Sequence, residues 1–233
     1  MYFPIGYTDD TLAEKAQQLA QHYGFVVDMQ ALPRLELTLQ GLFLLSPRFS
    51  GLQVDFSRVL HRAKLDKSHA LIRACKPISG MRIVDATAGW GRDAALLAEA
   101  GAQVLLVEKQ PVMAALLADG LERLPADISA LSLVHCDAYL YLQHLEPDAY
   151  PDLIYIDPMH PVRQKSALVK KDMQVLQQLF GSDENVSELI ALAIKRARKK
   201  VVVKWPQRLP PLRVPQHHIS GKTVRFDIYQ VWV

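Results

Sequence analysis

Acidic residues stand at four points where an apolar run, of the kind that forms a buried strand, gives way to a turn. They are Asp85, Glu108, Asp137 and Asp157. Ligands of an open α/β sheet bind at the carboxyl ends of its strands, so these carboxylates should meet at one edge. Carboxylates accept hydrogen bonds from hydroxyl and amino groups, which a nucleoside offers. The spacing therefore indicates a pocket for a nucleoside-bearing cofactor, although any one of these residues alone could be a solvated loop acid.

The turn after the first run narrows the choice of cofactor. Residues 85–91 read D-A-T-A-G-W-G, and the glycines, Gly89 among them, let the backbone approach a ligand closely. A dinucleotide site needs G-x-G-x-x-G and a helix N-terminus that accepts a diphosphate, which Asp93 would repel. An acid there suits the ammonium and sulfonium groups of S-adenosylmethionine (SAM). We therefore expect a SAM site, with Glu108 on the ribose hydroxyls and Asp137 on the adenine amino group.

The turn after the fourth run indicates what could receive a methyl group. Asp157-Pro158-Met159-His160 resembles the [Asn/Asp]-Pro-Pro-aromatic signature of methyltransferases that modify exocyclic amino groups. Such an amine is a poor nucleophile because its lone pair is delocalised into the ring. Asp157 and the carbonyl of Pro158 could accept its two N–H bonds and favour the pyramidal nitrogen that attacks. Both are candidate catalytic residues, and the alternative is a proline-rich turn that merely ends a strand.

These residues require an alternating strand–helix frame, and the chain from Met81 onward has one. The expected strands cover 82–86, 103–107, 131–135, 153–156 and 201–204, and the expected helices cover 93–100, 111–124, 139–145, 169–180 and 184–199. Such alternation predicts a mostly parallel, doubly wound α/β sheet, which the runs 218–220 and 226–231 would close as an antiparallel hairpin. Rossmann-like class I SAM-dependent methyltransferases use this sheet, although periodicity alone also fits a dehydrogenase.

The N-terminal part of the chain reads differently. A helix is expected over 8–22, capped by Thr8 and ended by Gly24. Short strands are expected at 25–28, 35–39, 42–45 and 53–56, with a turn at Gln40-Gly41. The predicted organisation is a small antiparallel α+β unit over 1–56, a basic helical connector over 57–80 and the SAM-binding domain over 81–233.

The composition is that of a folded α/β protein. Half of the 233 residues are hydrophobic and 22% are charged, which allows a sizeable core. Cys75 and Cys136 show no metal-ligand spacing and suggest no disulfide framework, which fits a reducing compartment. The N-terminus does not read as a signal peptide, and no apolar run approaches the roughly 20 residues of a membrane helix. We expect a cytoplasmic protein with no bound metal.

Basic residues cluster in two stretches that could bind phosphates. The stretches are 57–76 and 162–171, and together they could form a nucleic-acid-binding surface beside the site. Charge runs are more often solvated faces, and we interpret 195–200 that way because cations are favourable at a helix C-terminus in any protein. The basic residues predicted to bind substrate are Arg62, Arg163 and Lys165.

Several of these motifs resemble the RsmJ family, the bacterial 16S ribosomal RNA guanine-N2 methyltransferases. The matching segments lie between about residues 55 and 230 and read V-D-A-T-A-G-W-G-R-D-A, A-A-L-L-A-D-G-L, Y-I-D-P-M-H-P-V-R-Q-K-S-A-L-V-K-K and R-F-D-I-Y. The resemblance implies SAM as cofactor, 16S ribosomal RNA or the small ribosomal subunit as partner, and N2-methylguanosine as product. By position it implies SAM contacts from Arg92, Asp93, Glu108, Lys109, Asp137, Ala138 and Asp157.

Two positions depart from that family. A small hydroxyl pair is usual where this chain has Asp137-Ala138, and an aromatic residue is usual where His160 stands. Histidine can still stack on a base, so we expect His160 to flank the target base.

Three other functions fit parts of the pattern. An NAD-dependent oxidoreductase would need a dinucleotide turn that the chain lacks. A non-catalytic RNA-binding or ribosome-assembly factor on a methyltransferase fold would not need the Asp157-Pro158 turn. A DNA adenine methyltransferase would use the same kind of turn to bind an exocyclic amine, but the chain has no obvious additional DNA-recognition domain.

Overall fold

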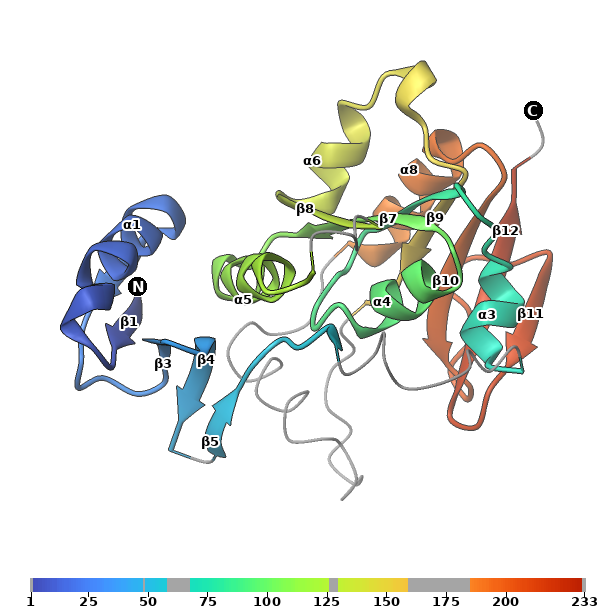
Figure 1. Ribbon diagram of the computed structural model, residues 1–233. Helices are drawn as coiled ribbons and strands as arrows, with labels where there is room; N and C mark the ends of the chain where they lie inside the picture. The colour runs from blue at the N-terminus through green and yellow to red at the C-terminus, as the bar shows by residue number, and fades with distance from the viewer. Residues whose placement is uncertain (1, 48, 58–67, 126–129, 159–184, 232–233) are drawn as a thin grey trace.

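The chain folds into two β-sheets with helices packed against them (Figure 1). The computed structural model describes residues 2–47, 49–57, 68–125, 130–158 and 185–231, and all that follows concerns these residues. None of the helices in this part of the chain is long and apolar enough to cross a membrane.

The N-terminal sheet has the strand order β2-β1-β3-β4-β5. Its strands are β1 (Phe3–Tyr7), β2 (Phe25–Val27), β3 (Arg34–Thr38), β4 (Gly41–Ser46) and β5 (Phe49–Leu52). The strands β3, β4 and β5 pair antiparallel, but β1 pairs in parallel with both β2 and β3. The expected antiparallel unit is therefore a mixed sheet. Strand β1 was not predicted, because Pro4 and Gly6 interrupt any strand-like pattern there.

The N-terminal helix begins later than expected. The helix α1 (Ala13–Tyr23) follows a 3-10 turn (Asp10–Leu12), and the side chain of Asp9, rather than Thr8, caps that turn by accepting from the Thr11 N–H. Gly24 ends α1 in the left-handed region, as predicted. The fourth expected strand, 53–56, is wrong: these residues follow β5 as an irregular segment with a bend at Phe56.

The second sheet has the order β11-β12-β10-β9-β6-β7-β8. Its strands are β6 (Arg82–Asp85), β7 (Gln103–Glu108), β8 (Leu131–His135), β9 (Leu153–Ile156), β10 (Lys200–Pro206), β11 (His217–Ser220) and β12 (Val224–Gln230). The pairings among β8, β7, β6, β9 and β10 are parallel, and β12 runs antiparallel between β10 and β11. This confirms the doubly wound sheet with its closing hairpin.

Helices cover both faces of this sheet (Figure 1). They are α3 (Ala70–Cys75), α4 (Arg92–Glu99), α5 (Pro111–Glu122), α6 (Ala138–Gln143) and α8 (Val186–Arg196), with a 3-10 turn at Pro147–Ala149. One apolar cluster joins α3, α4 and α5 to one face and continues into the N-terminal unit, and a second joins α6 and α8 to the other. The expected helix 169–180 lies outside the described residues.

Two features of the sheet set the position of the site. All four residues of β9 are buried, as expected of a strand covered on both faces. The strand order reverses between β6 and β9, since β7 and β8 continue to one side and β10 to the other. Such a switch point is where α/β sheets bind ligands.

The basic run 195–200 lies at the edge of the sheet away from the carboxyl ends of the parallel strands. Two of its arginines bind neighbouring segments of the fold. The guanidinium of Arg196 donates to the carbonyl of Leu142 near the end of α6, and that of Arg198 donates to the carbonyl of Asp148. The expected solvated face fits Lys195, Arg198 and Lys199, which are exposed, but not Arg196 and Lys200, which are partly buried.

Candidate functional site

A cavity of about 780 Å³ lies at the carboxyl ends of β6, β7, β9 and β10. Every residue predicted to contact the cofactor lines it, as does Pro158: the set is Gly89, Arg92, Asp93, Glu108, Lys109, Asp137, Ala138 and Asp157. The volume is within the range of roughly 300–1,000 Å³ that is usual for small-molecule sites.

Glycines shape the turn between β6 and α4. Gly89 and Gly91 have φ of +52° and +67°, in the left-handed region where side chains are strained. The N–H of Gly89 donates to Oε2 of Glu108 (3.0 Å), while Oε1 of Glu108 accepts from the N–H of Gln110 (2.8 Å). Glu108 is only 8% exposed and ties the turn to the end of β7. Each carboxylate oxygen can accept a second hydrogen bond, so this geometry is compatible with a pair of ribose hydroxyls as further donors.

Asp137 begins helix α6. Its Oδ1 accepts from the N–H groups of Tyr139 (2.8 Å) and Leu140 (3.1 Å), which makes it an N-cap as well as a lining residue. Tyr139 and Leu140 line the cavity and are 41% and 50% exposed. Val186 and Leu189 of α8 line it too, and α6 contacts α8. This part of the cavity therefore offers apolar surface for a flat ring next to a carboxylate.

A lysine that the sequence analysis overlooked joins two of the predicted acids. Nζ of Lys204, near the end of β10, lies 2.9 Å from Oδ2 of Asp93 and 2.7 Å from Oδ2 of Asp157. The hydroxyl of Tyr155 also donates to Oδ2 of Asp93 (2.6 Å). Burial disfavours the charge on Lys204, but the two carboxylates outweigh it and hold the pKa of its ammonium above the ordinary value. Lys204 therefore holds Asp93 and Asp157 next to each other.

Asp157 is fixed from a second direction. Its backbone N–H donates to Oγ1 of Thr87 (2.6 Å), so the turn after β9 is bonded to the turn after β6. The next residue, Pro158, is buried and lines the cavity. The candidate catalytic pair and the candidate cofactor turn are thus neighbours. Other residues predicted to bind substrate lie outside the described ranges: Arg62, His160, Arg163 and Lys165.

Asp85 lies beneath the site and is 1% exposed. Burial raises the pKa of Asp85 to about 8, and the hydrogen bond that it accepts from the Thr87 N–H opposes this rise. The negative charges of the nearby acids add to the rise; these acids are Asp93, Asp157 and Glu108. Asp85 is therefore largely protonated in the folded protein at neutral pH.

A pH dependence of stability follows from Asp85. Between its ordinary pKa of 3.8 and about 8, the folded state holds a proton that the unfolded state has lost, so stability falls as pH rises through this window. Relative to Asp85→Asn, the wild-type free energy of unfolding should fall by at most about 1.4 kcal/mol per pH unit and level off above the folded pKa. Urea denaturation of both proteins from pH 5 to pH 9 measures this, and parallel curves would contradict it.

Some residues of the site were not predicted, because little in the sequence distinguishes them from ordinary strand and turn residues. Lys204 ends an apolar strand, where a lysine looks like an ordinary solvated terminus. Tyr155 lies inside a buried run and looks like core. Thr87 is an unremarkable member of the turn. Within the described ranges, no group of three or more His, Cys, Asp or Glu side chains is arranged to hold a metal ion.

Known proteins of one family are similar to most of this chain. Residues 18–231 match a family model described as that of a SAM-dependent methyltransferase. The chain is 53% identical to ribosomal RNA small subunit methyltransferase J of Legionella pneumophila (strain Corby), over 97% of this chain and 95% of that protein. It is 42% identical to the protein of the same name from Yersinia enterocolitica, over 91% and 90%. A crystal structure of a SAM-dependent methyltransferase from Neisseria gonorrhoeae matches with a TM-score of 0.77 at 27% identity, over 98% and 96%.

Proposed function

Because the chain belongs to the family of ribosomal RNA small subunit methyltransferase J, a family of SAM-dependent methyltransferases, we propose that it methylates the exocyclic N2 of a guanine in 16S ribosomal RNA. The resemblance found in the sequence is thereby confirmed, and with it SAM as the cofactor. Membership leaves no support for the NAD-dependent oxidoreductase. The methylated atom and the residues that act on it are the substance of the proposal.

The cavity suits SAM in its chemistry as well as its size. Glu108 would accept from the ribose hydroxyls, and Asp137 with the backbone of Ala138 would face the adenine. Asp93, Arg92 and Lys109 also line the cavity and would surround the charged parts of the cofactor. SAM, when bound there, supplies a methyl group on a positively charged sulfur.

The residues that would act on the substrate are Asp157 and Pro158. The Asp157 carboxylate and the Pro158 carbonyl would accept the two N–H bonds of the guanine amine and hold its nitrogen toward the methyl group. The ammonium of Lys204 lies 2.7 Å from Oδ2 of Asp157 and would hold this carboxylate in place as the acceptor. The target base must leave any stack or pair to reach this depth. His160 would flank the base.

The observation that best supports the proposal is the hydrogen bond from the Asp157 N–H to Thr87, which joins the turn after β9 to the turn after β6. A direct test incubates the protein with tritiated SAM and small subunits from a strain that lacks the modification, followed by digestion to nucleosides. Tritium in N2-methylguanosine is the expected result. Label on another nucleoside, or none with a folded protein that binds SAM, would overturn the proposal.

Beside the Asp157 turn, exposed cations offer a path for the RNA backbone. The N–H of Gln207 donates to the carbonyl of Thr223, which lines the cavity, so the residues after β10 meet the β11–β12 turn there. The buried guanidinium of Arg225 donates to three carbonyls in this corner: Pro206, Gln207 and Leu209. Arg208 and Lys222 belong to these two segments and are exposed. We expect them to contact phosphates, together with Arg62, Arg163 and Lys165.

The double variant Arg208→Gln/Lys222→Gln should therefore weaken RNA binding but not SAM binding. Loss of two contacts to single-stranded RNA should flatten the slope of log K against log salt by about 1.4. A matched control is Lys195→Gln/Lys199→Gln, which removes the same charge from exposed positions near the opposite edge of the sheet. RNA titrations at several salt concentrations measure the slopes. Equal slopes for the two variants would show that this corner does not contact the RNA.

A further inference from the structure

The N-terminal unit supplies a ring that supports the cofactor turn from behind. Phe56, in the segment after β5, is 2% exposed. A Cβ atom at Gly91 would lie 2.6 Å from Cε1 and 2.9 Å from Cζ of this ring, so the ring rests directly on the backbone of Gly91. Residues Asp85–Trp90, Arg92 and Asp93 line the cavity but Gly91 does not, which places the ring on the side of the turn away from the ligand.

The same ring touches helix α5. A Cβ atom at Gly120 would lie 3.2 Å from Cε2 of Phe56 and 2.7 Å from Cγ1 of Val54. Helix α5 starts three residues after Glu108, whose carboxylate binds the Gly89 N–H from the cavity side. The turn is therefore held between Glu108 in front and Phe56 behind, and both supports converge on α5.

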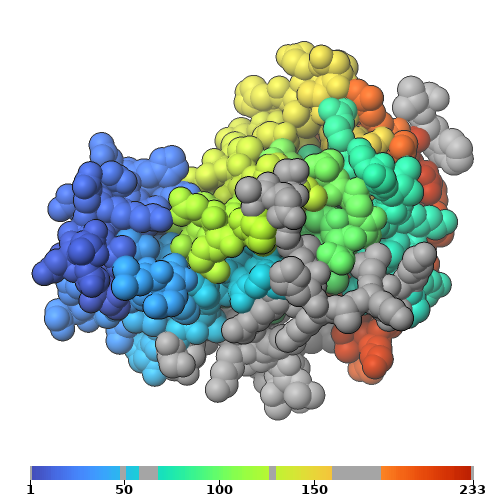
Figure 2. Space-filling view, viewed as in Figure 1, coloured from blue at the N-terminus to red at the C-terminus, as the bar shows by residue number. Residues whose placement is uncertain are grey.

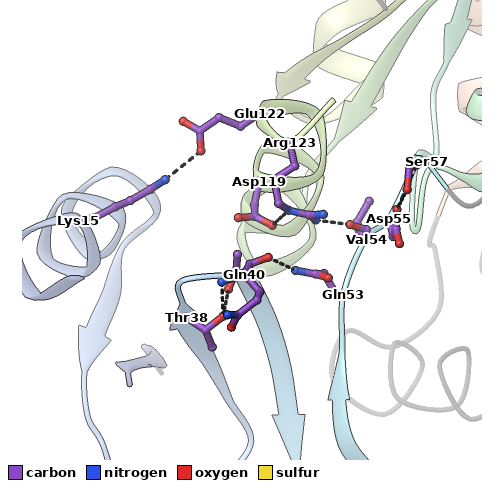
Figure 3. Close-up of polar contacts among 11 residues, drawn as sticks. Lys15, Thr38, Gln40, Gln53, Val54, Asp55, Ser57, Asp119, Glu122 and Arg123 are labelled. Atoms are coloured by element: carbon purple, nitrogen blue, oxygen red, sulfur yellow. Dashed lines mark hydrogen bonds and ion pairs between the residues drawn. The ribbon is translucent and has the colours of Figure 1, made fainter. Parts of the chain in front are cut away.

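Polar contacts fasten the segment that carries Phe56 (Figure 3). The guanidinium of Arg123, which also pairs with Asp119 at 3.0 Å, donates to the carbonyl of Val54. The side chain of Gln53 donates to the carbonyl of Gln40 (3.0 Å), which ties the segment to the N-terminal sheet. Figure 2 shows the N-terminal residues packed closely against the region of α5 on this face.

We propose that Phe56 is a positioning residue for the cofactor turn, so that the N-terminal unit is a working part of the SAM site. The ring restricts the turn to the shape in which the Gly89 N–H meets Glu108. Binding of the cofactor should in return stabilise residues 53–57. This inference rests on the proposed location of SAM in the cavity, and the first experiment separates the two.

Hydrogen exchange on the wild-type protein, with and without S-adenosylhomocysteine, tests the coupling. We expect the ligand to slow exchange in residues 86–93 and also in 53–57, which lie outside the cavity. Protection of 86–93 without 53–57 would overturn the role of Phe56 and leave the site intact. No protection of 86–93 would overturn the proposed location of SAM itself.

Variants test the same point by affinity. Phe56→Ala should raise the Kd for S-adenosylhomocysteine by at least about tenfold, and Phe56→Leu, which keeps part of the volume, by less. With both substrates saturating, kcat should change much less than Kd, because the ring touches no reacting atom. The matched control is Phe25→Ala, which removes a buried ring of the same unit that stacks on Tyr23. An unchanged Kd in folded Phe56→Leu and Phe56→Ala, or an equal rise in Phe25→Ala, would contradict the proposal.

Discussion

Replacement of Asp157 with alanine is expected to lower kcat for methyl transfer by about two to three orders of magnitude, the usual effect of removing an acceptor or donor that acts in the transition state. The change takes away the carboxylate proposed to hold the guanine amine. The binding of SAM should change much less, since Glu108 and Asp137 remain. Single-turnover rates with saturating SAM and RNA, together with calorimetry for the cofactor, separate the two effects.

Two further variants make this test specific. Asp157→Asn keeps an oxygen acceptor but loses the charge that pairs with Lys204, so its rate should lie between wild type and alanine. Asp152→Asn, at the other end of β9, alters an acid that pairs with Lys199 and accepts from the Arg82 N–H, and should leave kcat unchanged. A rate within tenfold of wild type for Asp157→Ala would refute the catalytic role. An alanine variant that is inactive yet corrects every defect of a deletion strain would support the non-catalytic assembly factor.

The sequence predicted the frame of the site well because the frame depends on periodicity. Buried parallel strands read as short apolar runs, and the residue after each run falls at the ligand edge whatever the details of the loops. For that reason the pattern of apolar runs alone was enough to place Asp85, Glu108, Asp137 and Asp157 at that edge. Strand β1 was not predicted because its sequence, F-P-I-G-Y, contains two residues that are unfavourable in strands.

The sequence could not predict partners that come from distant parts of the chain. In the sequence, Asp93 looks like an acid open to a cationic ligand, but Nζ of Lys204, 111 positions later in the chain, lies 2.9 Å from its Oδ2. Asp93 thus shares the positive charge of Lys204 with Asp157, which offsets part of the charge of Asp93 and weakens its exclusion of a diphosphate. Phe56 is a similar case, because nothing in an isolated phenylalanine reveals contact with a glycine 35 positions later. Both contacts follow from the order of the strands in the sheet and from the packing of distant segments. The pattern of residue types along a short stretch of sequence predicts neither.

Replacement of Lys204 with methionine should separate catalysis from cofactor binding. The variant leaves Asp93 and Asp157 without their shared cation, so the Asp157 side chain loses a contact that holds it at the cavity. We expect kcat to fall about a hundredfold, as for displaced catalytic groups in general. The cavity becomes more negative, so a cationic cofactor should bind at least as tightly. The loss of stability should be about 1–3 kcal/mol, less than for a fully buried pair, because the three side chains remain 22–32% exposed.

The matched control is Lys200→Met, at the other end of the same strand. Nζ of Lys200 donates to the carbonyl of Ala74 and is half-buried, so its loss should also cost stability. Lys200 lies at the edge of the sheet away from the cavity, so the kcat of the Lys200→Met variant should stay at the wild-type value. Thermal unfolding, cofactor calorimetry and single-turnover rates on both variants decide the matter. If Lys204→Met bound SAM more weakly but retained the wild-type rate at saturating cofactor, Lys204 would belong to the cofactor site alone. Asp157 would then hold its position through Thr87 without help from the lysine.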